Sequence, residues 1–292
     1  SLNSNILIFN IKNKKIVIEI ILQDENTLKA GLFFLEKNLL FTTYRNNRNL
    51  GIWSITDDDI FEHSNLDINN FVGQKESFDL VSVAINDEEN LLSIVISSGF
   101  LLLIDITKIN EPRIKDKFLI TSDPSCITNF DKINKRVIVC TDSGIINCFS
   151  YHDESEKPKY LDCGIKNVAT WTINPLNGNL VGGTRDGKVF VWDYKNNNSI
   201  INIIRANTTS VKSIHITPNG IMYIIYSSSI YAINTLKNYE IVKRMIIPNK
   251  NPFFSIGCFF SDDKVIASSN EGLCFWDLKK QKNIIAYHRS EE

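Results

Sequence analysis

The stretch VGGTRDGKVFVWDYKNNN, Val181–Asn198, contains the pattern that decides the fold. A short apolar run leads into the turn sequence Arg185–Gly187. A run rich in β-formers, Val189–Val191, follows and is closed by Trp192–Asp193. A turn signal between two such runs is typical of a β-hairpin. If the pattern recurs along the chain, the hairpin is one part of a repeat.

The closing run does recur, as LIFNI, GIWSI, LLIDI, NCFSY, IYAINT and LCFWDL. Aligned on the small polar residue near its end, the run places that residue at seven positions: Asn10, Ser54, Asp105, Ser150, Asp193, Asn234 and Asp277. Neighbouring positions lie 41 to 51 residues apart. A single period over the whole chain indicates a repeat architecture.

Each copy has a constant context. An alternating run such as VKSIHITPNG and an apolar run such as IMYIIYS precede it, and a further β-rich run such as EIVKRMIIP follows. Helical periodicity is nearly absent, so each unit predicts four short antiparallel strands. Repeated units of this size predict an all-β propeller of about seven blades, in which each blade buries its faces against its neighbours.

The expected domain is a single propeller over residues 1–292, with an incomplete first blade. We predict this half blade and six complete blades at residues 1–27, 28–68, 69–124, 125–166, 167–210, 211–250 and 251–292. The half blade consists of strands at Ile6–Ile11 and Ile16–Ile21. Two sources of its missing strands are open: sequence upstream of Ser1, or a partner that completes the blade.

Two segments resemble the WD-repeat family. LVGGTRDGKVFVWDY has Asp-Gly in its turn and Trp-Asp at the end of its third strand, and SSNEGLCFWDL is similar. The Gly-His pair that often opens such repeats is absent, so the family's hydrogen-bonded side-chain tetrad is mostly missing. The resemblance implies either a divergent WD-repeat propeller or blades that pack by apolar contacts alone. It also implies structural roles for four residues: Trp192, Asp193, Trp276 and Asp277.

Composition narrows the class of protein. The chain has 292 residues, a net charge of −1 and 43% hydrophobic residues. It therefore has no overall attraction to nucleic acid or to anionic membranes. No apolar span is long enough to cross a membrane, so we expect no membrane insertion. The six cysteines form no C-x-x-C pair and several fall in apolar runs, which favours reduced core residues in an intracellular protein, cytoplasmic or nuclear.

No catalytic motif is present: there is no G-x-S-x-G, H-E-x-x-H, Walker or G-x-G-x-x-G sequence. We expect no catalytic residue, metal or cofactor. The resemblance implies a non-catalytic scaffold that mediates protein–protein interaction within a multi-subunit intracellular complex. The alternative is a propeller enzyme, a hydrolase with its site at the central channel. The predicted inner strands contain one histidine and few other ionisable residues, which argues against it.

Two faces of the expected propeller offer binding residues. One face carries the linkers between blades and the turns between second and third strands, where protein partners usually dock on such folds. The candidates on it are Tyr44, Arg45, Lys166, Arg185, Asp186 and Phe253. Arginine and aromatic residues are enriched in binding hot spots.

The opposite face carries the turns that follow each third strand. An arc of lysines is predicted there, at Lys12, Lys14, Lys15, Lys195, Lys237, Lys279, Lys280 and Lys282. Such an arc would speed the encounter with an acidic partner. The alternative is that it serves only solubility.

Overall fold

The computed structural model describes residues 5–10, 15–21, 28–34, 39–44, 49–55, 60–72, 78–120, 126–153, 155–196, 198–246, 257–261, 264–269, 272–277, 280 and 282–288. The chain divides into two compact units, and each is described by itself. Unit 1 comprises Ser1–Phe130, Lys135–Val139 and Asn147–Lys159. Unit 2 comprises Asp131–Asn134, Cys140–Ile146 and Tyr160–Glu292.

Unit 1 begins with a two-stranded sheet of β1 (Asn5–Asn10) and β2 (Lys15–Ile21). The next sheet contains β3 (Leu28–Phe34), β4 (Leu39–Tyr44), β5 (Asn49–Ile55) and β6 (Ile60–Asp67). A one-turn helix, α1 (Asn69–Val72), precedes the sheet of β7 (Leu80–Asn86), β8 (Leu91–Ile96), β9 (Phe100–Asp105) and β10 (Arg113–Leu119).

The following sheet has residues in both units and contains β11 (Cys126–Asp131), β12 (Arg136–Thr141), β13 (Ile145–Ser150) and β14 (Lys159–Asp162). Unit 2 continues with β15 (Val168–Ile173), β16 (Leu180–Thr184), β17 (Lys188–Asp193) and β18 (Ser199–Arg205). The next sheet contains β19 (Ser213–Ile216), β20 (Ile221–Ile225), β21 (Ser229–Asn234) and β22 (Glu240–Ile246). The last contains β23 (Gly257–Ser261), β24 (Lys264–Ser269), β25 (Gly272–Asp277) and β26 (Lys282–His288).

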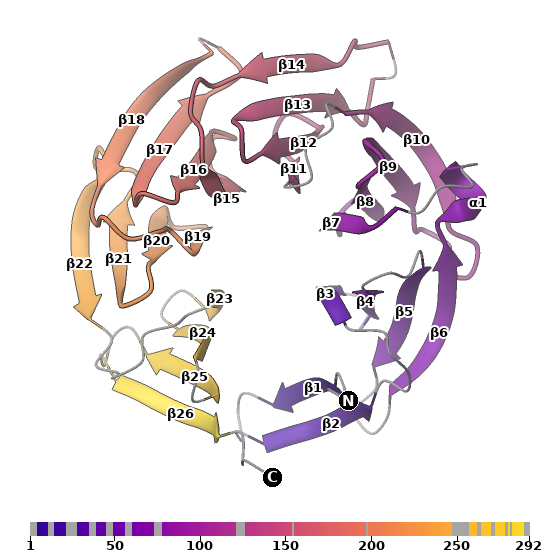
Figure 1. The fold of residues 1–292 in the computed structure, drawn as a ribbon, viewed down its shortest axis with the longest axis horizontal. Coiled ribbons are helices and arrows are strands. Elements are labelled where there is room, and N and C mark those ends of the chain that lie inside the picture. Colours follow the sequence, from indigo (N-terminus) through magenta and orange to yellow (C-terminus); the bar gives the residue numbers. More distant parts are fainter. Residues whose placement is uncertain are drawn as a thin grey trace. The chain divides into compact units, whose positions relative to one another are not determined.

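Consecutive strands pair antiparallel in every sheet, so each sheet is a simple meander (Figure 1). The described residues contain six four-stranded sheets and one two-stranded sheet, in the chain order that the repeat predicts. Each four-stranded sheet falls within one of the predicted blade ranges. The exact blade boundaries, the closure of a ring and the source of further strands beside β1 and β2 stay predictions.

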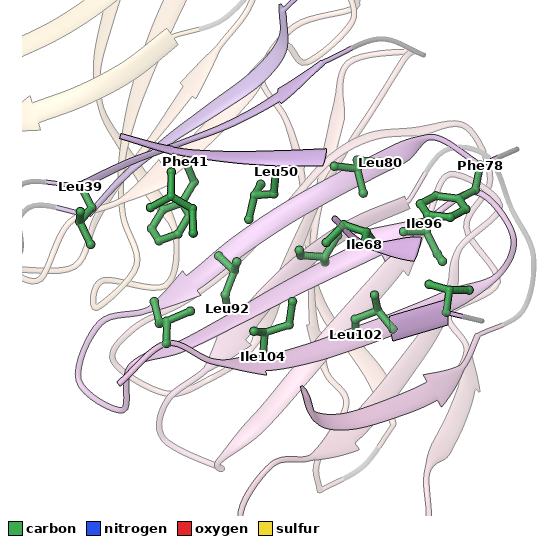
Figure 2. Packing of buried hydrophobic residues seen from close by; sticks show 14 residues of the cluster. Leu39, Phe41, Leu50, Ile68, Phe78, Leu80, Leu92, Ile96, Leu102 and Ile104 are labelled. Atoms are coloured by element: carbon green, nitrogen blue, oxygen red, sulfur yellow. The ribbon is translucent and has the colours of Figure 1, made fainter. Parts of the chain in front are cut away.

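Hydrophobic side chains form the core between neighbouring sheets. In unit 1, Leu39, Phe41 and Leu50 of one sheet pack with Leu92 and Ile104 of the next (Figure 2). In unit 2, the β16 and β17 valines form the same kind of cluster with residues of β19 to β21. Burial of this apolar surface is the main force that stacks the sheets.

Buried hydrogen bonds also join the sheets. In unit 1, the Ser93 and Thr128 hydroxyls lie 3.1 Å apart. In unit 2, the Trp171 indole N–H donates to the Thr141 carbonyl over 3.2 Å. The Tyr226 hydroxyl donates to the Gly187 carbonyl over 3.0 Å. The alternative in which blades pack by apolar contacts alone is therefore wrong, because buried polar groups of neighbouring sheets are hydrogen-bond partners of one another.

Candidate functional site

Linkers between sheets lie beside the turns between second and third strands, as expected. In unit 2, the Arg185 N–H donates to the Asn167 carbonyl over 2.9 Å, and the Val168 N–H donates to the Asp142 carbonyl over 3.0 Å. In unit 1, the Asp79 N–H donates to the Ser97 hydroxyl over 2.8 Å. We call this side of unit 2, formed by residues 142–144, 164–168 and 184–188, the loop face.

The turns of the loop face are held by threonine side chains. The Lys188 N–H donates to Thr184 Oγ1 over 3.0 Å, and that hydroxyl donates to the Asp186 carboxylate. Thr141 accepts the Ile145 N–H over 2.9 Å in the same way. Gly187 closes its turn at a φ of 89°, a conformation that other residues adopt only with strain. Side-chain hydrogen bonds therefore close both hairpin turns of the loop face.

Sequence reasoning recognised the turn glycines but missed the threonines. The signal was present: Thr-x-x-Gly occurs as Thr141–Gly144, Thr184–Gly187 and Thr217–Gly220. Thr217 Oγ1 accepts the Ile221 N–H over 3.1 Å, so the motif also closes the turn between β19 and β20. The three positions mark hairpin turns and do not by themselves mark a ligand site.

The structure brings the unit 2 candidates of the loop face together. Lys166 is exposed on the linker between β14 and β15. The Arg185 side chain is 64% exposed, with its guanidinium 3.9 Å from the Asp142 carboxylate. Asp186 forms an ion pair with Lys188. The hydrogen bonds from Lys188 and Thr184 hold the pKa of the Asp186 carboxyl below its usual value.

A groove of about 330 Å³ opens beside these residues. The linker contributes Gly164, Ile165 and Lys166, and the turn and the two strands after it contribute the rest: Thr184, Asp186, Lys188, Phe190, Ile200, Ile203 and Arg205. Its walls are apolar and its charged residues are mainly cations. A concave surface of this composition suits a ligand that combines an apolar group with negative charge.

The other candidates of this face belong to different parts of the chain. Tyr44 ends β4, and its side chain lies outside the described residues. Arg45 and Phe253 also lie outside them. These three candidates stay predictions.

The lysine arc is described only in part. The Lys195 ammonium donates a hydrogen bond to the Asn177 carbonyl. Lys237 and Lys280 are exposed. Lys15 and Lys282 begin β2 and β26, and their side chains lie outside the described residues. Lys12, Lys14 and Lys279 lie outside them entirely. A continuous arc stays a prediction.

At five of the seven aligned positions, the described side chain closes the turn after a third strand. The Asp193 carboxylate accepts the Lys195 N–H over 3.2 Å and the Asn196 N–H over 3.1 Å. Asp277 accepts the Lys280 N–H over 2.9 Å. At the same position of other units, the side chains of Asp105, Ser150 and Asn234 also accept a backbone N–H of the following turn. These side chains serve the backbone of their own turn.

The hydrogen bonds to the Asp193 carboxyl also change its pKa. Burial raises its pKa, but the hydrogen bonds from Asn196 and Lys195 together outweigh burial, so its pKa lies below the usual value. Trp192, beside it, is 1% exposed and belongs to the core. Trp276 lies in β25 opposite Val265, and its side chain is outside the described residues.

Chemistry-bearing groups do not gather in the described part of the chain. Among those residues, no three histidine, cysteine, aspartate or glutamate side chains lie close enough together to hold a metal ion. Cys140, Cys148 and Cys163 are buried cysteines that form no disulfide. No helix in the described ranges is both long and apolar enough to cross a membrane.

Comparison with known proteins identifies the architecture. The C-terminal WD40 domain of Sif2 matches with a TM-score of 0.66 and 16% sequence identity, over 91% of this chain and 72% of that one. No protein-family model matches the chain, and no curated protein matches it. The structural match, with the meander sheets, confirms the all-β propeller fold that the repeat predicts. At this identity the likeness concerns the fold alone.

Proposed function

Since the chain has the fold of a WD40 β-propeller, we propose that it is a non-catalytic scaffold that binds protein partners within a multi-subunit intracellular complex. The observation that carries the proposal is the loop face of unit 2, where exposed Lys166 lies on a linker and exposed Arg185 on a turn, and a backbone hydrogen bond joins this linker to this turn. Rigid surfaces bind with a smaller entropy cost than flexible ones. An exposed arginine on such a surface is a favourable anchor.

Three buried cysteines support the intracellular part of the proposal. Cys140, Cys148 and Cys163 are buried without forming disulfides. Proteins of the cytoplasm and nucleus keep cysteines in this reduced form. No arrangement of the described residues favours the hydrolase alternative, and we do not propose it.

A cross-linking pull-down from the source cells tests the proposal. We expect wild-type chain to recover a reproducible set of proteins, with cross-links that involve Lys166. Reversing the charge at Lys166→Glu and Arg185→Glu together should reduce recovery by about tenfold or more, because hot-spot residues dominate binding energy. Lys157→Glu is the matched control, since Lys157 is also an exposed lysine of a connecting segment.

Two results contradict the proposal in different ways. Recovery of no proteins by wild type contradicts a scaffold function. Equal recovery by wild type and by the double variant leaves the scaffold but removes the loop face of unit 2 as its docking surface.

A further inference from the structure

Two pairs of directly opposed residues on β17 and β18 line the groove in unit 2. Phe190 lies opposite Ile203, and Lys188 lies opposite Arg205. Directly opposed side chains on antiparallel strands lie side by side on one face. An apolar pair is thus followed by a cationic pair along the same two strands.

The apolar wall of the groove is open to solvent. Ile200 is 38% exposed and Ile203 is 48% exposed, although both are aliphatic. β18 is one of the two edge strands of its sheet, whose strand order is β15-β16-β17-β18. Edge strands with exposed aliphatic side chains are sites at which extended segments of other proteins add.

The charged residues that line the groove carry a net positive charge. The groove contains Lys166, Lys188 and Arg205 but one acid, Asp186. The Asp186 carboxylate already binds Lys188 and the Thr184 hydroxyl. Neither Lys166 nor Arg205 forms an ion pair with another described residue. Two cations therefore remain for a ligand beside the apolar wall.

The neighbouring sheet carries a different residue at the position equivalent to Ile203. β22 has the same alternation of exposed and buried positions as β18. At its position opposite Tyr231, however, stands Arg244, whose guanidinium lies over the tyrosine ring at 5.5 Å from the centroid. The cation there packs on an aromatic ring of its own chain, whereas Ile203 and Arg205 face the groove.

We propose that this groove binds an extended segment of a partner protein in which an aliphatic or aromatic side chain is flanked by acidic residues. The inference rests on the proposed scaffold function and names the chemistry of its partner. The apolar side chain fills the space between Phe190, Ile200 and Ile203. The acidic residues pair with Lys166 and Arg205, so the segment runs along β18.

A peptide selection tests the chemistry directly. Random dodecapeptides displayed on phage are selected on the wild-type chain and counter-selected on Ile203→Glu. We expect the enriched peptides to carry an apolar residue flanked by aspartate or glutamate. The affinity of the best peptide, labelled with fluorescein, is then measured by fluorescence anisotropy for each variant.

The variants distinguish the groove from general stickiness. Ile203→Glu and Arg205→Glu should each weaken binding of the labelled peptide by about tenfold or more, as expected of central contacts. Ile241→Glu is the matched control, because Ile241 is also 48% exposed and lies on the equivalent edge strand. It should change affinity by no more than about twofold, as surface substitutions away from a site do. Thermal unfolding of each variant verifies that the fold is intact.

Several outcomes overturn the proposal. They are enrichment of no peptide, enrichment of basic or uncharged peptides, and equal binding by Ile203→Glu and Ile241→Glu. Phosphatidylserine vesicles are a further probe: binding by wild type that Ile203→Glu and Arg205→Glu abolish would assign the groove to a lipid surface instead. If Ile203→Glu recovers the full partner set from cells, the groove inference fails while the scaffold function stands.

Discussion

Two neighbouring sheets of unit 2 build the same strand order from different side chains. In the sheet of β15 to β18, the register aligns Trp171, Gly182, Phe190 and Ile203 in one row across the four strands. The corresponding row in the sheet of β19 to β22 is Ile214, Ile224, Tyr231 and Arg244.

Gly182 explains the difference. A Cβ atom at this position would lie 2.4 Å from the Phe190 ring, so the ring occupies the space of the missing side chain. Trp171 and Phe190, on either side, meet edge to face with centroids 5.3 Å apart. In the next sheet Ile224 fills the same space, and Tyr231 instead contacts Tyr226, with centroids 5.5 Å apart. The same strand order therefore accommodates two arrangements. In one, a glycine leaves room for the aromatic ring of the next strand, and in the other an isoleucine side chain occupies that space.

The largest expected effect is at the aromatic pair. Trp171→Ala removes the ring from Phe190 and leaves the Thr141 carbonyl without its indole donor. We expect a loss of about 3–5 kcal/mol in the free energy of unfolding, measured by denaturant titration. Ile214→Ala, at the equivalent position, should cost less because fewer atoms are removed and no hydrogen bond is lost. A greater cost at Ile214 would show that the aromatic pair is not the stronger solution.

A smaller effect is expected from filling the glycine. Gly182→Ala should lower the free energy of unfolding by about 1–3 kcal/mol, since the new methyl group overlaps the Phe190 ring. Combining it with Phe190→Leu should recover part of that loss, which a double-mutant cycle measures. Additive losses in the double variant would mean that the glycine serves a purpose other than making room for the ring.

The pattern of the sheets could be predicted from the sequence, but the groove could not. The aligned polar residues located every third strand, and the half unit appears as β1 and β2 at almost the expected residues. The glycines of LVGGT were visible, yet nothing in the sequence tells that Gly182 lies under Phe190. Likewise, Lys166 lines one groove with residues of β18, and the linker that carries it is held by a hydrogen bond from the Arg185 N–H to the Asn167 carbonyl. Contacts between sheets depend on packing geometry, which a period does not specify.

The smallest expected effect is on the pH dependence of stability. It is found by comparing two turn-closing residues, the charged Asp193 and the neutral Asn234. The pKa of Asp193 is lowered in the folded chain, so its contribution to stability is present above the unfolded value. It is lost as pH falls from about 4 through the lower folded pKa. Asp193→Asn should therefore flatten the acid side of the stability curve, and Asn234→Asp should steepen it.

Unfolding midpoints measured between neutral pH and about pH 2 check this prediction. The Asp193→Asn variant keeps a side-chain oxygen for the Lys195 and Asn196 N–H groups, so its stability at neutral pH should change little. Parallel curves for wild type and both variants would contradict the assignment.

The self-closing turns also bear on how the chain folds. Strands pair with their sequence neighbours, and the side chain that secures the turn after a third strand comes from that strand itself. Such hairpins require few distant contacts, which favours rapid folding. Interactions between sheets reach further, as in the 30 residues between Thr141 and Trp171 and the 39 between Gly187 and Tyr226. A nascent chain can thus complete one sheet during synthesis and use it as the template on which the next sheet docks.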